Sequence, residues 1–155
     1  MPDTDVDNER PVENLDARSN ARIERYKKAR SEFFRSLDAF GGTLHTVEAA
    51  RLLGITETAL VDQVNEDRLI GIINSDEQEY LIPAFQFVGA EKLPHLEEIL
   101  AYLGDVSDFA ACSWFLNEPY EGFGRPAEVL RSGASDEQLK ALRRDASLFL
   151  SPEAS

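Results

Sequence analysis

Glycine and proline divide the sequence after residue 40 into short segments, and most of these segments have apolar residues at steps of three and four. That spacing is the period of an α-helix with one buried face. With 43% hydrophobic and 29% charged residues, the 155-residue chain has the composition of a globular protein. The pattern predicts a mainly α-helical fold. The glycine and proline residues that separate the segments are Gly41, Gly42, Gly54, Pro83, Pro94, Gly104, Pro119, Pro126 and Gly133.

Charge is distributed unevenly over the first forty residues. Residues 1–16 carry a net charge of -5, whereas residues 17–40 carry +4. The first segment has too little apolar surface to offset its ordering entropy, so we expect an acidic disordered tail over residues 1–16. The basic segment predicts a helix with one buried stripe, and its cations form either an ordinary solvated face or an arm that contacts phosphates. The stripe consists of Ile23, Tyr26, Phe33, Phe34, Leu37 and Phe40.

The segment 41–90 predicts two short helices followed by a β-hairpin. Thr46 is a candidate N-cap for a helix that stops at Gly54, and Thr56 is a candidate N-cap for a second helix. This is the spacing of a helix-turn-helix. Residues 69–73 and 80–82 favour strands around a turn at 74–76, which predicts a small wing. We therefore expect residues 17–90 to form an N-terminal domain with a basic helix and a winged helix-turn-helix.

Residues 91–155 predict a C-terminal helical bundle. Helices are expected to begin at Pro94, at Asp105 and at Pro126, and the pair Ser135 and Gln138 has the spacing of a capping box. The last helix has an apolar stripe at Leu139, Leu142, Ala146 and Phe149.

The second helix of the helix-turn-helix, TETALVDQVNED, is acidic. A DNA-reading helix normally brings basic or amide side chains to the major groove, but this one has four acids and no base. The alternative is a helix-turn-helix retained for dimerisation or docking. If DNA is bound, Thr56, Thr58, Gln63 and Asn65 are the candidates to contact bases. The candidates to contact phosphates are Arg51 and Arg68, together with Arg22, Arg25, Lys27 and Lys28 of the basic helix.

The sequence offers no pattern typical of a catalytic or metal centre. His45 and His95 lie fifty residues apart, Cys112 is the single cysteine, and no glycine-rich phosphate loop is present. We therefore predict a protein that is not an enzyme and has no cofactor. The net charge of -13 argues against general polyanion binding. Apolar runs are too short to span a membrane, and the first residues do not resemble a signal peptide, so we expect a cytoplasmic protein.

Aromatic residues cluster between positions 114 and 123. Core packing is the default interpretation of such a cluster and accounts for Phe115. Tyr120 and Phe123, however, lie on a loop bounded by glycine and proline, next to Arg125. Aromatic residues beside an arginine are common anchors of protein interfaces, so this loop is the best candidate binding site.

Most of the chain resembles the Xre/MbcA/ParS antitoxin family. The resemblance runs from about residue 25 to residue 146, and it rests on the order of a helix-turn-helix ending in PAFQF, then LPHLEEILAYLGD, then WFLNEPYEGFGRPAEVLRSG. Its most specific parts are F-L-x-x-P at 115–119, G-R-P at 124–126 and L-x-x-G at 130–133. One departure is the acidic second helix, because members that repress their own promoter generally have basic residues there.

The resemblance implies a partner and a binding surface. The partner would be a RES-domain toxin that attacks NAD or uses it to modify proteins, the antitoxin would be a dimer, and residues 148–155 would reach toward the toxin's cleft. The predicted toxin-binding residues are Tyr120, Phe123, Gly124, Arg125, Pro126, Leu130 and Arg131. Two other functions fit the residues, a stand-alone winged helix-turn-helix regulator with a C-terminal dimerisation bundle, and an adaptor whose partner is not a toxin.

Overall fold

The computed structural model describes the backbone of residues 2–74 and 79–149, and the side chains of residues 17–74 and 79–149. This part of the chain is mainly helical, with short antiparallel strands, as the sequence predicts. It divides into two compact units, one up to Ala39 and one from Phe40 onward. The domain boundary expected at residues 90 and 91 therefore falls inside the second unit.

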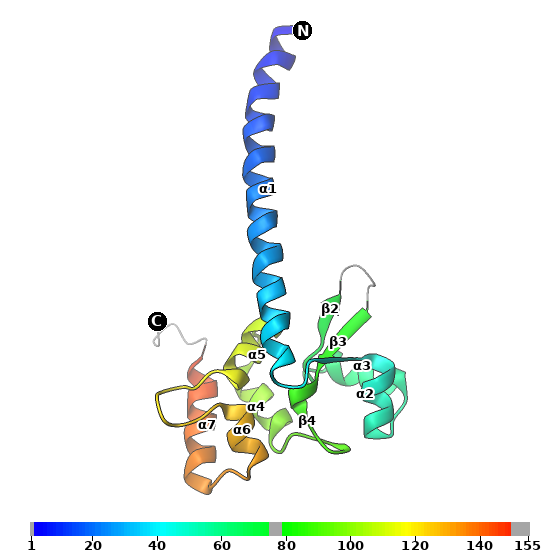
Figure 1. The fold of residues 1–155 in the computed structure, drawn as a ribbon, viewed down its shortest axis with the longest axis vertical. Coiled ribbons are helices and arrows are strands. Elements are labelled where there is room, and N and C mark those ends of the chain that lie inside the picture. The colour runs from blue at the N-terminus through cyan, green and yellow to red at the C-terminus, as the bar shows by residue number, and fades with distance from the viewer. Residues whose placement is uncertain (1, 75–78, 150–155) are drawn as a thin grey trace. The chain divides into compact units, whose positions relative to one another are not determined.

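Helix α1 spans Pro2–Asp38 and is the only element of the first unit in the described residues (Figure 1). The helix includes residues 2–16, where the sequence led us to expect a disordered tail. No glycine or proline interrupts the chain between Pro11 and Gly41, so no residue there breaks the helix. The predicted stripe is buried only in part, because Ile23 and Tyr26 are 48% and 58% exposed. Their unit has no second element against which they could pack.

The second unit begins with β1 (Thr43–His45), α2 (Thr46–Leu53) and α3 (Glu57–Asn65). Thr56 caps α3 as predicted, because its side chain accepts a hydrogen bond from the Ala59 N–H. Gly54 ends α2 in the left-handed conformation, with φ of 68°. The predicted cap at Thr46 is wrong by one residue, since His45 is the N-cap and its N–H donates to Glu48.

Three short strands form an antiparallel sheet in the order β1-β3-β2, in which β2 is Ile72–Asn74 and β3 is Glu79–Pro83. Leu44 pairs with Ile82 across β1 and β3, and Ile73 pairs with Tyr80 across β2 and β3. Part of the turn predicted at 74–76 lies outside the described residues. The first predicted strand, 69–73, is shorter than expected and begins only at Ile72.

The PAFQF sequence forms a buried corner after the sheet. It contains the 3₁₀ helix η1 (Ala84–Gln86) and the start of β4 (Phe87–Val88), which pairs with β5 (Glu91–Lys92). Gln86 is completely buried; its amide donates to the carbonyls of Ile70 and Pro83 and accepts the Ile70 N–H. Both backbone groups of Ile70 thus bond to a side chain instead of to a neighbouring strand, which explains the short β2.

Two helices follow, α4 (Leu96–Leu103) and α5 (Asp108–Leu116). Both begin later than the sequence indicates. The N-cap of α4 is His95, at a positive φ of 65°, so Pro94 lies outside the helix. The N-cap of α5 is Ser107, whose side chain accepts from the Ala110 N–H, so Asp105 is not the cap.

The last two helices begin where the sequence predicts. Pro126 is the first residue of α6 (Pro126–Arg131), and Ser135 and Gln138 form the capping box of α7 (Asp136–Leu148). Helix α7 packs against α4, and α6 packs against α5. The most deeply buried side chains come from both halves of the unit, which therefore shares one core. They include Leu60, Ile82, Ile99, Phe115, Leu130 and Leu142.

Candidate protein-binding site

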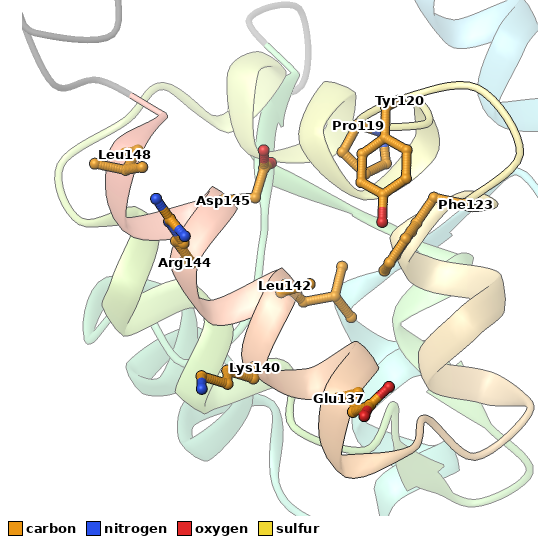
Figure 2. Close-up of a pocket in the computed structure, with 10 residues that line it drawn as sticks. Pro119, Tyr120, Phe123, Glu137, Lys140, Leu142, Arg144, Asp145 and Leu148 are labelled. Carbon is orange, nitrogen blue, oxygen red and sulfur yellow. The ribbon is translucent and has the colours of Figure 1, made fainter.

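An open hollow of about 400 Å³ lies between the α5–α6 loop and helix α7. Figure 2 shows Tyr120 and Phe123 on the loop side of the hollow and Lys140 and Arg144 on helix α7. Most of the lining is apolar. The complete lining is Pro119, Tyr120, Phe123, Glu137, Lys140, Ala141, Leu142, Arg144, Asp145 and Leu148.

Tyr120 and Phe123 form an aromatic wall. Their ring centroids lie 5.0 Å apart with an interplanar angle of 61°, an edge-to-face contact. Tyr120 is 61% exposed, whereas Phe123 is half-buried. Packing against its neighbour holds the exposed ring in place, so a partner that covers it has less conformational entropy to remove.

Hydrogen bonds within the loop hold its shape. The Phe123 N–H donates to the Tyr120 carbonyl, and the Gly122 N–H donates to the Glu118 carboxylate. Gly124 has a φ of 99°, and an added Cβ would lie 3.3 Å from Val129, so another residue there would be strained. The loop therefore has a defined conformation before any partner binds.

A hydrogen bond between Trp114 and Asp145 joins α5 to α7, and Asp145 is part of the lining of the hollow. The indole Nε1 of Trp114 donates to Oδ2 of Asp145 over 2.7 Å, and the Trp114 ring packs edge-to-face on Phe115. Trp114 is 4% exposed and Phe115 is completely buried. The interpretation of Phe115 as a core residue is confirmed.

The other predicted toxin-binding residues support the loop or the core. The Arg125 guanidinium stacks 5.1 Å from the Phe40 ring centre, and Pro126 is buried at the start of α6. Leu130 is completely buried and has no surface to offer a partner. Arg131 donates to the carbonyls of Phe85 and Phe87, 46 and 44 residues away in sequence.

The α7 side of the hollow was missed at the level of sequence. Glu137, Ala141, Arg144 and Leu148 recur at steps of four, three and four along the helix, opposite the stripe that packs into the core. That spacing signals a second face of α7, but a polar helix face is usually only solvated. The sequence thus showed the face without showing that the α5–α6 loop lies across from it.

The predicted DNA-contacting residues are dispersed. Arg51 and Thr58 are exposed on α2 and α3, while Thr56 is engaged as the cap. Gln63 accepts a hydrogen bond from Lys92 at 2.7 Å. The four predicted residues of α1, which are Arg22, Arg25, Lys27 and Lys28, are exposed and belong to the other unit.

Ion pairs near α3 and α4 engage several cations that DNA would need. Arg68 and Lys92 both bond to the carboxylate of Glu97, at 2.6 and 2.8 Å. These bonds, from Lys92 first and Arg68 second, lower the pKa of Glu97 below its ordinary value. A second pair joins Arg143 to Glu98 and lowers the pKa of Glu98.

Cys112 is completely buried in α5. Burial, with a smaller contribution from Asp108, raises the pKa of the Cys112 thiol to about 12. The thiol is therefore protonated at neutral pH and unreactive.

In comparisons with known proteins, no protein-family model, curated protein or solved structure matches this chain. In the ranges 2–74 and 79–149, no helix combines the length and apolarity that a membrane span requires. Within the same ranges, no three His, Cys, Asp or Glu side chains lie close enough together to hold a metal ion.

Proposed function

We propose that this chain is a non-enzymatic binding protein of the antitoxin type, which neutralises a RES-domain toxin in the cytoplasm. It would act by covering the toxin's NAD cleft with its C-terminal helices, so that exclusion and not chemistry stops the toxin. The observation that supports this proposal is the apolar hollow at Tyr120 and Phe123. The hollow lies in the part of the sequence that resembles the toxin-binding domain of the Xre/MbcA/ParS antitoxins.

The hollow has the features of an interface anchor. Hot spots are typically aromatic residues in preorganised, partly enclosed positions, and truncating one costs about 2 kcal/mol or more of binding free energy. Tyr120 has the exposed area for such a contact, and Phe123 supports it from the side. The charged residues of α7 provide a polar rim around the apolar centre, which is the usual anatomy of a protein interface.

The test is co-expression with a RES-domain protein, which we expect to be encoded beside this chain. We expect a complex that co-purifies and in which the toxin no longer consumes NAD. The double substitution Tyr120→Ala and Phe123→Ala should weaken binding by about 100-fold or more. Tyr102→Ala is the matched control, because Tyr102 is 44% exposed on α4 and does not line the hollow. A RES-domain protein that is neither bound nor inhibited refutes the proposal.

A second candidate function is transcriptional regulation as a homodimer, by a winged helix-turn-helix alone or in addition to toxin binding. It is favoured by the order of α2, α3 and the β2–β3 pair and by the exposed Arg51 and Thr58. The acidic surface of α3 and the engagement of Gln63 and Arg68 disfavour it.

Fluorescence anisotropy with the DNA upstream of the gene tests this second function. Binding should weaken steeply with salt and should fall when the α1 cations Arg22, Arg25, Lys27 and Lys28 are replaced by alanine. Lys140→Ala is the control, since it removes an exposed cation from a different surface. No binding at low salt would eliminate DNA recognition.

A further inference from the structure

We propose that the hollow takes an acidic and apolar segment of its partner. An aromatic or branched aliphatic side chain of that segment would pack on Tyr120 and Phe123, and a carboxylate near it would pair with Lys140 and Arg144. The inference concerns the same site as the proposed function and rests on it for the role of that site, but not for the identity of the partner.

The apolar part of the hollow defines the anchor. Ala141 and Leu142 line the hollow on α7, and Leu148 lines it nearly two helical turns further along. The aromatic wall stands opposite Leu142 (Figure 2). The volume of about 400 Å³ is at the lower end of the range for ligand pockets, and the hollow is open to solvent. Such a shape suits one or two side chains of a polypeptide.

The cations beside the hollow are the second observation. Residues 40–149 contain eight Lys and Arg side chains. Four of them form ion pairs with carboxylates, and Arg131 bonds to backbone carbonyls. Within the described part of the chain, the other three, Arg51, Lys140 and Arg144, have no hydrogen-bond or ion-pair partner for the side chain. Two of these three lie at the hollow.

Unpaired cations at this position are informative because the whole chain is acidic, with a net charge of -13. The Debye length at physiological ionic strength is about 8 Å, so a bound carboxylate responds to nearby charges more than to distant ones. Lys140 and Arg144 are four residues apart on α7, about one helical turn, so one carboxylate can reach both. Glu137 and Asp145 are the opposing charges in the lining, so the hollow is formally neutral within a strongly acidic chain.

These charges also set a direction. Glu137 is in the first turn of α7, Lys140 and Arg144 follow it, and Asp145 comes last, so the two cations lie between two carboxylates along the helix. Oδ2 of Asp145 already accepts a hydrogen bond from Trp114, whereas Lys140 and Arg144 have no such partner among the described residues. The acidic residue of the partner should therefore lie beside Lys140 and Arg144, away from Glu137.

A peptide selection tests the inference without assuming any partner. A displayed library of random 12-residue peptides is first depleted on the Tyr120→Ala, Phe123→Ala variant and then selected on the full-length protein. We expect enriched peptides to share an aromatic or branched aliphatic residue with Asp or Glu within about four positions, the span of one helical turn. Enriched peptides in which the residues next to the apolar anchor are basic or uncharged would overturn the inference, and so would a lack of enrichment.

Charge reversal then tests the role of the cations. The double variant Lys140→Glu, Arg144→Glu should bind the enriched peptide at least about tenfold more weakly, whereas Arg51→Glu should bind it within about twofold of the original protein. Equal affinities in all three proteins would overturn the inference. A toxin that binds with unchanged affinity after the double reversal contradicts this inference alone, while a toxin that does not bind at all contradicts the proposed function alone.

Discussion

Replacement of Gln86 by leucine should destabilise the second unit more than any other single amide substitution in it. Gln86 is completely buried and makes three hydrogen bonds, at 2.7 and 2.9 Å to Ile70 and at 3.1 Å to Pro83. Leucine has a similar volume, so the substitution opens little space and acts through the lost bonds. It leaves the Ile70 N–H and two carbonyls without these partners in the core.

The magnitude follows from the desolvation of those groups. A buried polar group left unsatisfied costs about 1–3 kcal/mol, and carbonyls, with two lone pairs, tolerate a lost bond better than an N–H does. We expect Gln86→Leu to lose about 3–5 kcal/mol of unfolding free energy. That is a large fraction of the roughly 5–15 kcal/mol typical of a domain.

Urea unfolding followed by Trp114 emission measures this loss, because Trp114 is the single tryptophan and is buried in the same unit. Gln63→Leu is the matched control, since Gln63 is only half-buried and makes one bond, to Lys92, so we expect a loss below about 1 kcal/mol. Gln86→Glu adds a diagnostic pH dependence, because a carboxylate buried among carbonyls should destabilise more at pH 7 than at pH 5. If Gln86→Leu is no worse than Gln63→Leu, the reasoning is refuted.

Three further predictions follow from the same packing and charges. Gly71→Ala should lose about 1–3 kcal/mol, because its Cβ would lie 2.8 Å from Val64. Urea midpoints check this, and an unchanged midpoint argues against it. Stability should also fall as pH rises above about 9, the ordinary thiol pKa, because the unfolded chain then loses the Cys112 proton while the folded protein, with a pKa of about 12, keeps it. The loss is about 1.4 kcal/mol per pH unit, and Cys112→Ala should remove it from the alkaline unfolding curve. Stability should also fall as pH drops below about 4.5, because the bonds from Lys92 and Arg68 that lower the pKa of Glu97 stabilise the fold only while its carboxylate is charged. Melting temperatures from pH 6 to pH 3 should therefore fall less steeply for Glu97→Gln than for the original protein. Equal slopes would contradict the pairing.

Local signals in the sequence predict helix ends well. The Thr56 cap, Pro126 at a first helical position and the Ser135–Gln138 box are all confirmed, because each depends on groups within four residues of one another. Hydrophobic spacing also predicts the buried face of α7, although Phe149 at its end is 40% exposed. The predicted start of α5 at Asp105 is wrong because Ser107, two residues later, provides a competing cap.

Features that depend on distant residues could not be predicted. The sequence PAFQF gives no sign that Gln86 bonds to Ile70, sixteen residues earlier, or that Arg131 reaches the carbonyls of Phe85 and Phe87. Both side chains look like ordinary polar residues until the fold brings their partners to them. For the same reason, the sequence identified Tyr120 and Phe123 as a candidate site but not the α7 residues across from them.

The bonds from Arg131 and the contact between Phe85 and Phe115, with ring centres 5.6 Å apart, join the two halves of the second unit. A gene break after codon 90 would leave each half with an uncovered apolar surface, so the separate fragments should aggregate when expressed alone. Recombination could not readily replace one half with the corresponding half of another protein, because the side chains of the new half would have to pack against those of the old half in a shared core. Selection on this chain therefore acts on both halves as one inherited module.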